Sequence, residues 1–390
     1  MLSGVLGRVT VNPRAQASVW TRAGVPLLAL AVALMLGAVI LVATGANPIE
    51  VYREMINASL NGKQPIERTL TFATPLLLTG LAAAVAFRMK LYSIGAEGQL
   101  FMGAIAASGI GLQLPADTPK VLMLSAMFVG GALAGAVWAG FAAVPKALFG
   151  TDEIITTLML NFVALGFMNY LIFGSQSFWR DPSRPVPQGN SLPESARLPL
   201  ISGRLHSGFV IAVVIAVLLW WILKRTTFGF RIRTIGDSVR AARYAGVGVP
   251  VAIVAVLAIS GGLAGVAGAI EVSGVTGRLD PSALAIELGY TGIVIATVAR
   301  LNPIGVIPVA ILLAAIATSG GSLQSIGVQV EVIRLLQGLI FLSVTAGEFF
   351  VSNRLGLRAE AVGSASEPDD EHGAQPGVDA RQLLADGGAS

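Results

Sequence analysis

Apolar residues gather in long runs along this chain, and most polar residues fall in the stretches between the runs. A helical run of about 20 apolar residues matches the hydrocarbon thickness of a bilayer. Such runs occur at 25–44, 70–87, 93–112, 120–143, 154–173, 208–223, 250–270, 289–299, 304–318 and 330–350. The pattern predicts an all-α fold, a polytopic membrane helix bundle with about ten transmembrane segments.

Two of the runs, 289–299 and 304–318, are short. At a rise of about 1.5 Å per residue, neither reaches the ~30 Å needed to cross a bilayer as a straight helix. We therefore expect broken or re-entrant helices in this part of the chain. The number of complete spans would then fall by one or two.

The composition agrees with a membrane protein and excludes several other classes. Only 12% of the 390 residues are charged, whereas a soluble domain carries about twice that share. Cysteine is absent, and the only histidines are His206 and His372. No Ser/His, paired-Asp or metal-ligand constellation is present, so we predict no catalytic residue and no metal site. The net charge of +4 is spread between apolar runs rather than over one basic face, so we expect no nucleic-acid partner.

The Lys and Arg residues predict the orientation of the spans. With the N-terminus inside, 16 of them lie in inner segments and nine in outer segments. Because positive charge accumulates on the cytoplasmic side, both termini should be cytoplasmic.

This orientation divides the chain into segments with different expected roles. They are a cytoplasmic N-terminal segment at 1–24, a transmembrane domain at 25–350 with outer loops at 45–69 and 174–207 and an inner loop at 224–248, and an acidic tail at 351–390. The first outer loop could form an amphipathic helix, and the second, rich in Pro and Ser, should be irregular. The tail has few large apolar residues, which predicts disorder.

The inner loop is the most polar sizeable island between the runs, and it has the signals of a short helix. Asp237 or Ser238 could cap its first turn, alanines follow, and Gly246 could supply a left-handed stop. A two-turn helix is predicted. It is either an ordinary positive loop at the headgroups or an element that docks into a cytoplasmic partner through Arg240, Arg243 and Tyr244.

The residues of this loop resemble a known family. The run TFGFRIRTIGDSVRAARYAGV at 227–247 is similar to the coupling-helix loop of permease subunits of ATP-binding-cassette (ABC) importers, in the branched-chain amino acid, simple-sugar and nucleoside branch. Four further blocks are similar in the same order: FRMKLYSIGAEGQLFMGAIAA at 87–107, TDEIITTLMLNFVA at 151–164, ELGYTGIVIATVARLNPIGV at 287–306 and VIRLLQGLIFLSV at 332–344. The longer permease subunit of nucleoside-type importers is the most similar type.

The resemblance implies a division of labour. A permease of this kind translocates a nucleoside or simple sugar inward across a bacterial inner membrane, with lipid around it. Its partners are cytoplasmic ABC ATPase subunits, a second permease subunit that makes a heterodimer, and an extracytoplasmic substrate-binding protein. ATP and Mg would bind the ATPase, and this chain would bind no cofactor. The sequence agrees, because it has no G-x-x-x-x-G-K-[ST] phosphate loop.

The resemblance also implies two sets of site residues. The expected ATPase-coupling residues are Gly229, Arg233, Gly236, Asp237, Arg240, Ala241, Ala242, Arg243 and Gly246. The expected translocation-path residues are Ser93, Glu97, Gln99, Thr157, Asn161, Glu287 and Tyr290.

Five of the path residues also have a structural alternative. Glu97 could form a local charge pair with Arg88 or Lys90 instead of facing a cavity. Thr157 and Asn161 share a helix face and could make interhelical hydrogen bonds. Glu287 and Tyr290 could anchor the outer interface.

Two other function classes compete with the importer subunit. An ion-coupled secondary transporter would use Glu97 or Glu287 as a proton carrier. A membrane-embedded enzyme ranks last, because the chain lacks a catalytic constellation.

Overall fold

The computed structural model describes residues 9–13 and 19–357, in two compact units. The smaller unit joins the two ends of the chain. Its strands β1 (Val9–Pro13) and β4 (Asn353–Leu357) pair antiparallel, with Val9 opposite Leu357. Part of the stretch expected to be disordered therefore forms a strand. The rest of the acidic tail, 358–390, and much of the N-terminal segment lie outside the described residues.

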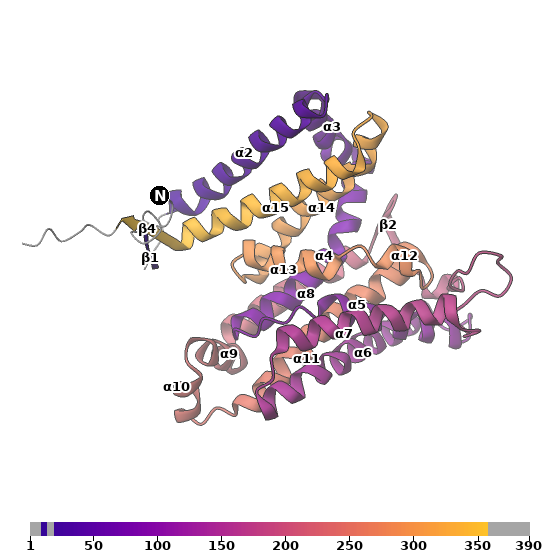
Figure 1. The fold of residues 1–390 in the computed structure, drawn as a ribbon. Coiled ribbons are helices and arrows are strands. Elements are labelled where there is room, and N and C mark those ends of the chain that lie inside the picture. Colours follow the sequence, from indigo (N-terminus) through magenta and orange to yellow (C-terminus); the bar gives the residue numbers. More distant parts are fainter. Residues whose placement is uncertain (1–8, 14–18, 358–390) are drawn as a thin grey trace, which may run out of the picture. The chain divides into compact units, whose positions relative to one another are not determined.

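The larger unit is helical (Figure 1). Its α-helices are α2 (Val19–Ala43), α3 (Pro48–Leu60), α4 (Lys63–Arg88), α5 (Ala96–Gln113), α6 (Lys120–Phe149), α7 (Glu153–Asn169), α8 (Gly208–Arg225), α9 (Thr227–Asp237), α10 (Val239–Tyr244), α11 (Val249–Glu271), α12 (Pro281–Leu284), α13 (Leu288–Val298), α14 (Pro303–Ser325) and α15 (Val330–Ser352). Short π-helical turns, Tyr170–Gly174 and Val272–Thr276, extend α7 and α11.

Eight helical segments in the described residues are long and apolar enough to cross a membrane, and a ninth counts if Ala31–Ala43 and α3, bent by 119°, form one broken span. The helical bundle is confirmed, with slightly fewer spans than the ten predicted. The difference is α5, which has 18 residues but includes Glu97 and Gln99 and does not pass as an apolar span.

The two short runs have different outcomes. The run at 289–299 becomes α13, which is 11 residues long and follows the single-turn α12, so this span is broken as predicted. The run at 304–318 was expected to be too short, and this expectation is wrong. Helix α14 continues through TSGGSLQS to Ser325, and its 23 residues reach ~34 Å.

Glycines allow three helices to pack closely. Helix α11 lies against α5 and α6 (Figure 1). A methyl group on Gly103 would lie 2.3 Å from the carbonyl oxygen of Gly265, and one on Gly135 would lie 2.2 Å from that of Gly261. The backbones therefore touch directly, as small residues four apart permit in membrane helices.

Helix α4 is the most enclosed of the candidate spans. It packs against α11, α13 and α14, and 78% of its apolar window is buried, against 28% for α6 and α7. The helix ends at Arg88, and the chain then breaks before α5. The break therefore follows an enclosed helix, although Lys90 and Tyr92 within it are exposed.

The two outer loops contain the structure expected of them. The first forms α3, capped by the Asn47 side chain, with Val51 buried and Ile49 and Ile56 exposed. The second is irregular apart from a 3-10 turn (Glu194–Ala196) and the short paired strands β2 (Leu200–Ser202) and β3 (Leu205–His206).

Candidate functional site

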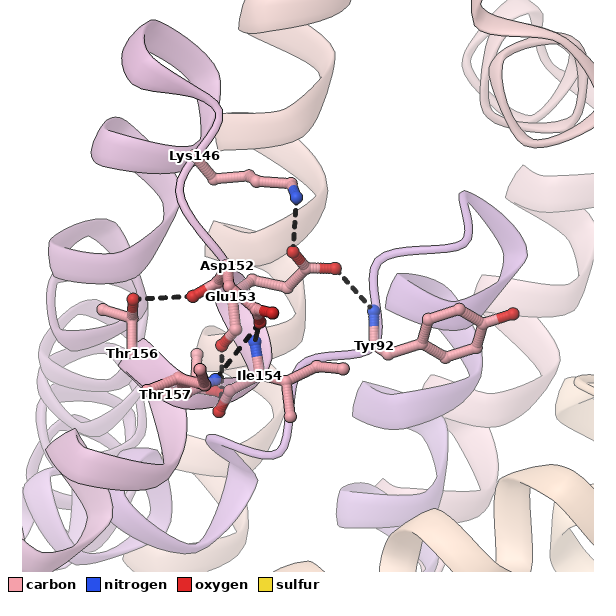
Figure 2. A network of polar contacts seen from close by, with 8 residues as sticks. Tyr92, Lys146, Asp152, Glu153, Ile154, Thr156 and Thr157 are labelled. Carbon is pink, nitrogen blue, oxygen red and sulfur yellow. Dashed lines mark hydrogen bonds and ion pairs between the residues drawn. The ribbon is translucent and has the colours of Figure 1, made fainter.

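The loop between α4 and α5 is tied to the start of α7. The Glu153 carboxylate accepts a hydrogen bond from the backbone N–H of Tyr92 at 3.1 Å, and the Thr157 hydroxyl accepts one from Ile94 at 3.0 Å. Figure 2 shows Glu153 between Tyr92 and Lys146, whose ammonium lies 2.6 Å from the second carboxylate oxygen. Backbone groups that the helix break leaves unpaired are thereby satisfied by side chains of another helix.

Asn161, one turn further along α7, joins three elements. Its side-chain oxygen accepts from the backbone N–H of Gly98 at 2.9 Å. Its amide nitrogen donates to the carbonyl of Ile94 at 2.9 Å and to the Tyr290 hydroxyl at 3.2 Å. The predicted interhelical hydrogen bonds of Asn161 are therefore present, and they connect α7, α5 and α13.

Glu97 lies at the N-terminus of α13. Its carboxylate accepts a hydrogen bond from the backbone N–H of Gly289, and Glu287, just before the helix, has the left-handed φ of 64°. A helix N-terminus has free N–H groups, and the buried carboxyl group of Glu97 supplies an acceptor for one of them. Among the described residues Glu97 makes no ion pair with Arg88 or Lys90, so the local charge pair is not formed.

The predicted path residues thus form one group, which we call the break cluster. It contains Ser93, Glu97, Gln99, Thr157, Asn161 and Tyr290. All except Tyr290 are 5% exposed or less, whereas Glu287 is exposed at the edge of the cluster. Most of these side chains bond to backbone at two helix breaks, whereas the buried side-chain oxygen of Gln99 has no hydrogen-bond partner among the described residues. The role of the cluster in solute passage stays a prediction.

Sequence reasoning missed the pair of Lys146 and Glu153. The available signal was the acidic start of the run TDEIITT: Asp152 caps α7 by accepting from Ile154 at 2.8 Å, and Glu153 follows in the first turn. Nothing in the sequence indicated that Glu153 would reach back to Lys146 on the preceding helix.

The inner loop folds into two helices, α9 and α10, which we call the coupling segment. The Ser238 hydroxyl caps α10 by accepting from Ala241 at 3.2 Å, and Gly246 follows the helix with φ of 74°. Both features were predicted, with Ser238 rather than Asp237 as the cap. Helix α9, with Asp237 at its end, was not predicted as a separate element.

The exposure of α10 is one-sided. Ala242 is fully buried, whereas Arg240, Arg243 and Tyr244 are exposed, Tyr244 by 82%. The buried alanine anchors the helix to the bundle. The two cations and the aromatic ring project away from it.

The coupling segment contacts the end of α4 directly, next to the loop at 89–95 between α4 and α5, which we call the break loop. A methyl group on Gly236 would lie 2.2 Å from the carbonyl oxygen of Arg88, so the α9 backbone rests on the end of α4. Earlier in α9, Gly229 packs on the backbone of Leu223 at the end of α8. The Arg233 guanidinium donates to the carbonyl of the same leucine at 2.7 Å. The segment is therefore fixed between α8 and the loop that leads to the break cluster.

Comparison with known proteins shows which family has a sequence of this kind. The family of branched-chain amino acid transport system / permease components matches residues 66–345, which include both the break cluster and the coupling segment. The chain belongs to this family.

Three curated relatives cover almost the whole permease. A glucose ABC transporter permease protein, TsgB13 of Haloferax volcanii, is 30% identical over 92% of this chain and 96% of its own length. The nucleoside ABC transporter permease protein NupB of Lactococcus lactis is 29% identical over 90% and 97%. The guanosine ABC transporter permease protein NupP of Bacillus subtilis is 32% identical over 83% and 92%. The chain is thus a permease subunit of an ABC transporter and a multi-pass membrane protein.

The permease has a second polar site, which the sequence did not indicate. A cavity of about 510 Å³ lies between the start of α4, the end of α11, α14 and the loop before β3. Glu271 lines it and is 6% exposed, and its carboxylate has no hydrogen-bond or ion-pair partner among the described residues. Arg68 and Arg204 also line this cavity, which we call the outer cavity after the expected position of the loop before β3.

His206 lies beside the outer cavity and is fully buried. Its Nδ1 accepts from the backbone N–H of Gly208 at 3.1 Å, while Nε2 has no partner in the described part of the chain. Gly274, a lining residue of the cavity, packs against the ring. Burial lowers the pKa of His206 from 6.5 to about 4, so the imidazole is neutral at pH 7.

Proposed function

We propose that this permease subunit imports a nucleoside or a simple sugar, using ATP hydrolysed by separate ATPase subunits. The names of the relatives, which specify nucleosides, guanosine and glucose, support this substrate class. ATP and Mg bind the ATPase, and this chain contributes no cofactor of its own.

The coupling segment is the proposed docking element for the ATPase. Arg240, Arg243 and Tyr244 project from a helix whose opposite side is anchored by buried Ala242. Two cations that a rigid helix holds in place suit a cleft lined by acidic side chains or backbone carbonyl groups. This segment therefore faces the cytoplasm, and with it both termini, in a bacterial inner membrane.

One observation carries the proposal: Gly236 of the coupling segment rests on the carbonyl oxygen of Arg88, with no room for a side chain between them. A displacement of α9 must move the end of α4 and the loop that follows. That loop is bonded to Glu153 and Thr157 of α7. Nucleotide-driven movement of an ATPase would reach the break cluster through these contacts.

In the proposed transport cycle the break cluster is the moving part. Its residues are enclosed by this chain's own helices, and the exposed Glu287 marks where the cluster meets its surroundings. A second permease subunit supplies the other wall of the path. An extracytoplasmic binding protein delivers the solute to the outer loops, and the solute crosses without chemical change.

Charge reversal at the tip of α10 tests the docking role. The double variant Arg240→Glu/Arg243→Glu, reconstituted with its ATPase and binding protein, should lose ATP-driven nucleoside uptake by at least about tenfold, because both cations would repel their partner. The control Arg225→Glu reverses an exposed cation at the end of α8, outside the coupling segment, and should transport normally.

Two results would contradict the proposal. One is unchanged ATP-driven uptake by the Arg240→Glu/Arg243→Glu variant at normal membrane insertion. The other is uptake by liposomes that hold this chain alone and are driven by a pH gradient, which would favour the ion-coupled transporter.

A further inference from the structure

A pocket beside the coupling segment has a strongly positive lining. It has a volume of about 630 Å³ and lies between the end of α4, α8, α9 and the turn between α13 and α14. Its charged lining residues are Arg88, Lys90, Lys224, Arg233, Arg300 and Asp237. Five cations thus face one carboxylate, and we call this site the basic pocket.

Three of the cations, Arg88, Lys224 and Arg233, contact neutral groups. Arg88 Nε donates to the carbonyl of Leu301 at 2.9 Å, and the Lys224 ammonium lies 4.9 Å from the centre of the Trp220 ring. Within the described ranges, Arg88, Lys90 and Lys224 form no ion pair with a carboxylate. Arg88 and Arg233 are close enough for their positive charges to repel. Such an arrangement is stabilised when an anion enters.

The chemistry of the lining selects the kind of anion. Three guanidinium groups with two ammonium groups beside them suit a phosphate, which offers several acceptor oxygens. Trp220 and Phe87 add apolar wall to the same pocket. On α8, the exposed apolar side chain of Val217 lies on the same helix face as the lining residues Trp220 and Lys224. An apolar approach to a phosphate-binding pocket fits acyl chains attached to the phosphate.

We propose that the basic pocket binds the phosphate headgroup of an anionic phospholipid. Basic pockets between membrane helices on the cytoplasmic side are typical sites for such headgroups. The inner position of the pocket depends on the proposed function, because it follows from the orientation of the coupling segment.

A bound headgroup would act on the coupling contact. Gly236 and Arg88, which touch each other, both line the pocket. The headgroup neutralises repulsion between α4 and α9 and holds them together with the turn before α14. Anionic lipid would thereby strengthen the mechanical link between the coupling segment and the break loop.

The test measures lipid retention rather than transport, so its failure is separate from failure of the proposed function. The purified permease complex is placed in nanodiscs that contain phosphatidylcholine with a minor share of phosphatidylglycerol, and co-purifying lipid is quantified by native mass spectrometry. We expect phosphatidylglycerol to be enriched on the wild type. Lys90→Gln/Lys224→Gln should reduce this enrichment by about tenfold. Arg225→Gln/Arg231→Gln, which removes two exposed cations outside the pocket, should leave it unchanged.

Three results would overturn the proposal. The first is absence of phosphatidylglycerol enrichment on the wild type. The second is equal loss of enrichment in both double variants. The third is displacement of the bound phosphatidylglycerol by millimolar inorganic phosphate, which would assign the pocket to free phosphate. If the double variant does not elute as a folded complex, Lys224→Gln alone serves the same comparison, because Lys224 contacts Trp220 on its own helix.

Discussion

Two buried carboxylates of this permease have opposite surroundings. Glu97 accepts a hydrogen bond from Gly289 at the N-terminus of α13, whereas Glu271 faces the outer cavity without a partner in the described part of the chain. The two residues are buried to nearly the same extent, with exposed fractions of 4% for Glu97 and 6% for Glu271. Burial alone therefore does not reveal what a membrane carboxylate does. The difference indicates that Glu97 supports the broken helices, while Glu271 remains available to a group that enters the cavity.

The largest expected effect is at Glu97. Glu97→Ala removes the acceptor at the start of α13 and leaves buried N–H groups unsatisfied, so it should lower the free energy of unfolding by about 3 kcal/mol. Thermal unfolding of the purified protein in detergent measures this. Glu331→Ala removes an exposed carboxylate and serves as the control. Equal unfolding temperatures for Glu97→Ala and this control would refute the capping role.

The second largest effect is a loss of stability at low pH that arises near the outer cavity. His206 lies beside the outer cavity, and its folded-state pKa of about 4 is below the unfolded value of about 6.5. The unfolded chain therefore binds the additional proton as the pH falls between these values, and the folded state loses stability. Lowering the pH from 7 to 5 should cost about 2 kcal/mol through this group.

His206→Asn keeps an acceptor near the Gly208 N–H but does not titrate in this range. Unfolding midpoints at pH 7 and pH 5 should therefore lie closer together in this variant than in the wild type. The same pH shift in both proteins would show that the acid sensitivity arises elsewhere.

The smallest effect tests the comparison most directly. Glu271→Gln removes a buried charge that lacks a partner, so it should raise the free energy of unfolding by about 1 kcal/mol. Glu97→Gln should not raise it, because this carboxylate already accepts a hydrogen bond from the backbone N–H of Gly289. If both substitutions destabilise the protein in the same unfolding measurement, Glu271 has a partner in the folded state and the contrast does not hold.

The sequence predicted the features that depend on local signals. Apolar runs predicted the helices, and Ser238 and Gly246 predicted the ends of α10. Each signal lies within a few residues of the structure it specifies. The end of α14 was missed, because small and polar residues extend that helix beyond its apolar run.

The contacts of the candidate site, in contrast, join residues that lie far apart in the chain. Glu97 and Gly289 are 192 residues apart in the chain, and Asn161 and Tyr290 are 129 apart. The resemblance to permeases selected these residues, but neither spacing nor hydropathy specifies which helix end a carboxylate will meet. Glu271 was missed for a related reason, since one acidic residue at the end of an apolar run looks like an interface residue until its neighbours are known.

The direct backbone contacts of α5, α6 and α11 limit how the permease can change shape. Gly103 on Gly265 and Gly135 on Gly261 leave no space for sliding, since a shift of one helix along another would drive neighbouring side chains into the opposing backbone. These three helices should therefore travel as one rigid block during a transport cycle. In the proposed transport cycle this block then moves as a unit, and α13, whose Gly289 packs equally closely on the backbone of Glu97 in α5, moves with it.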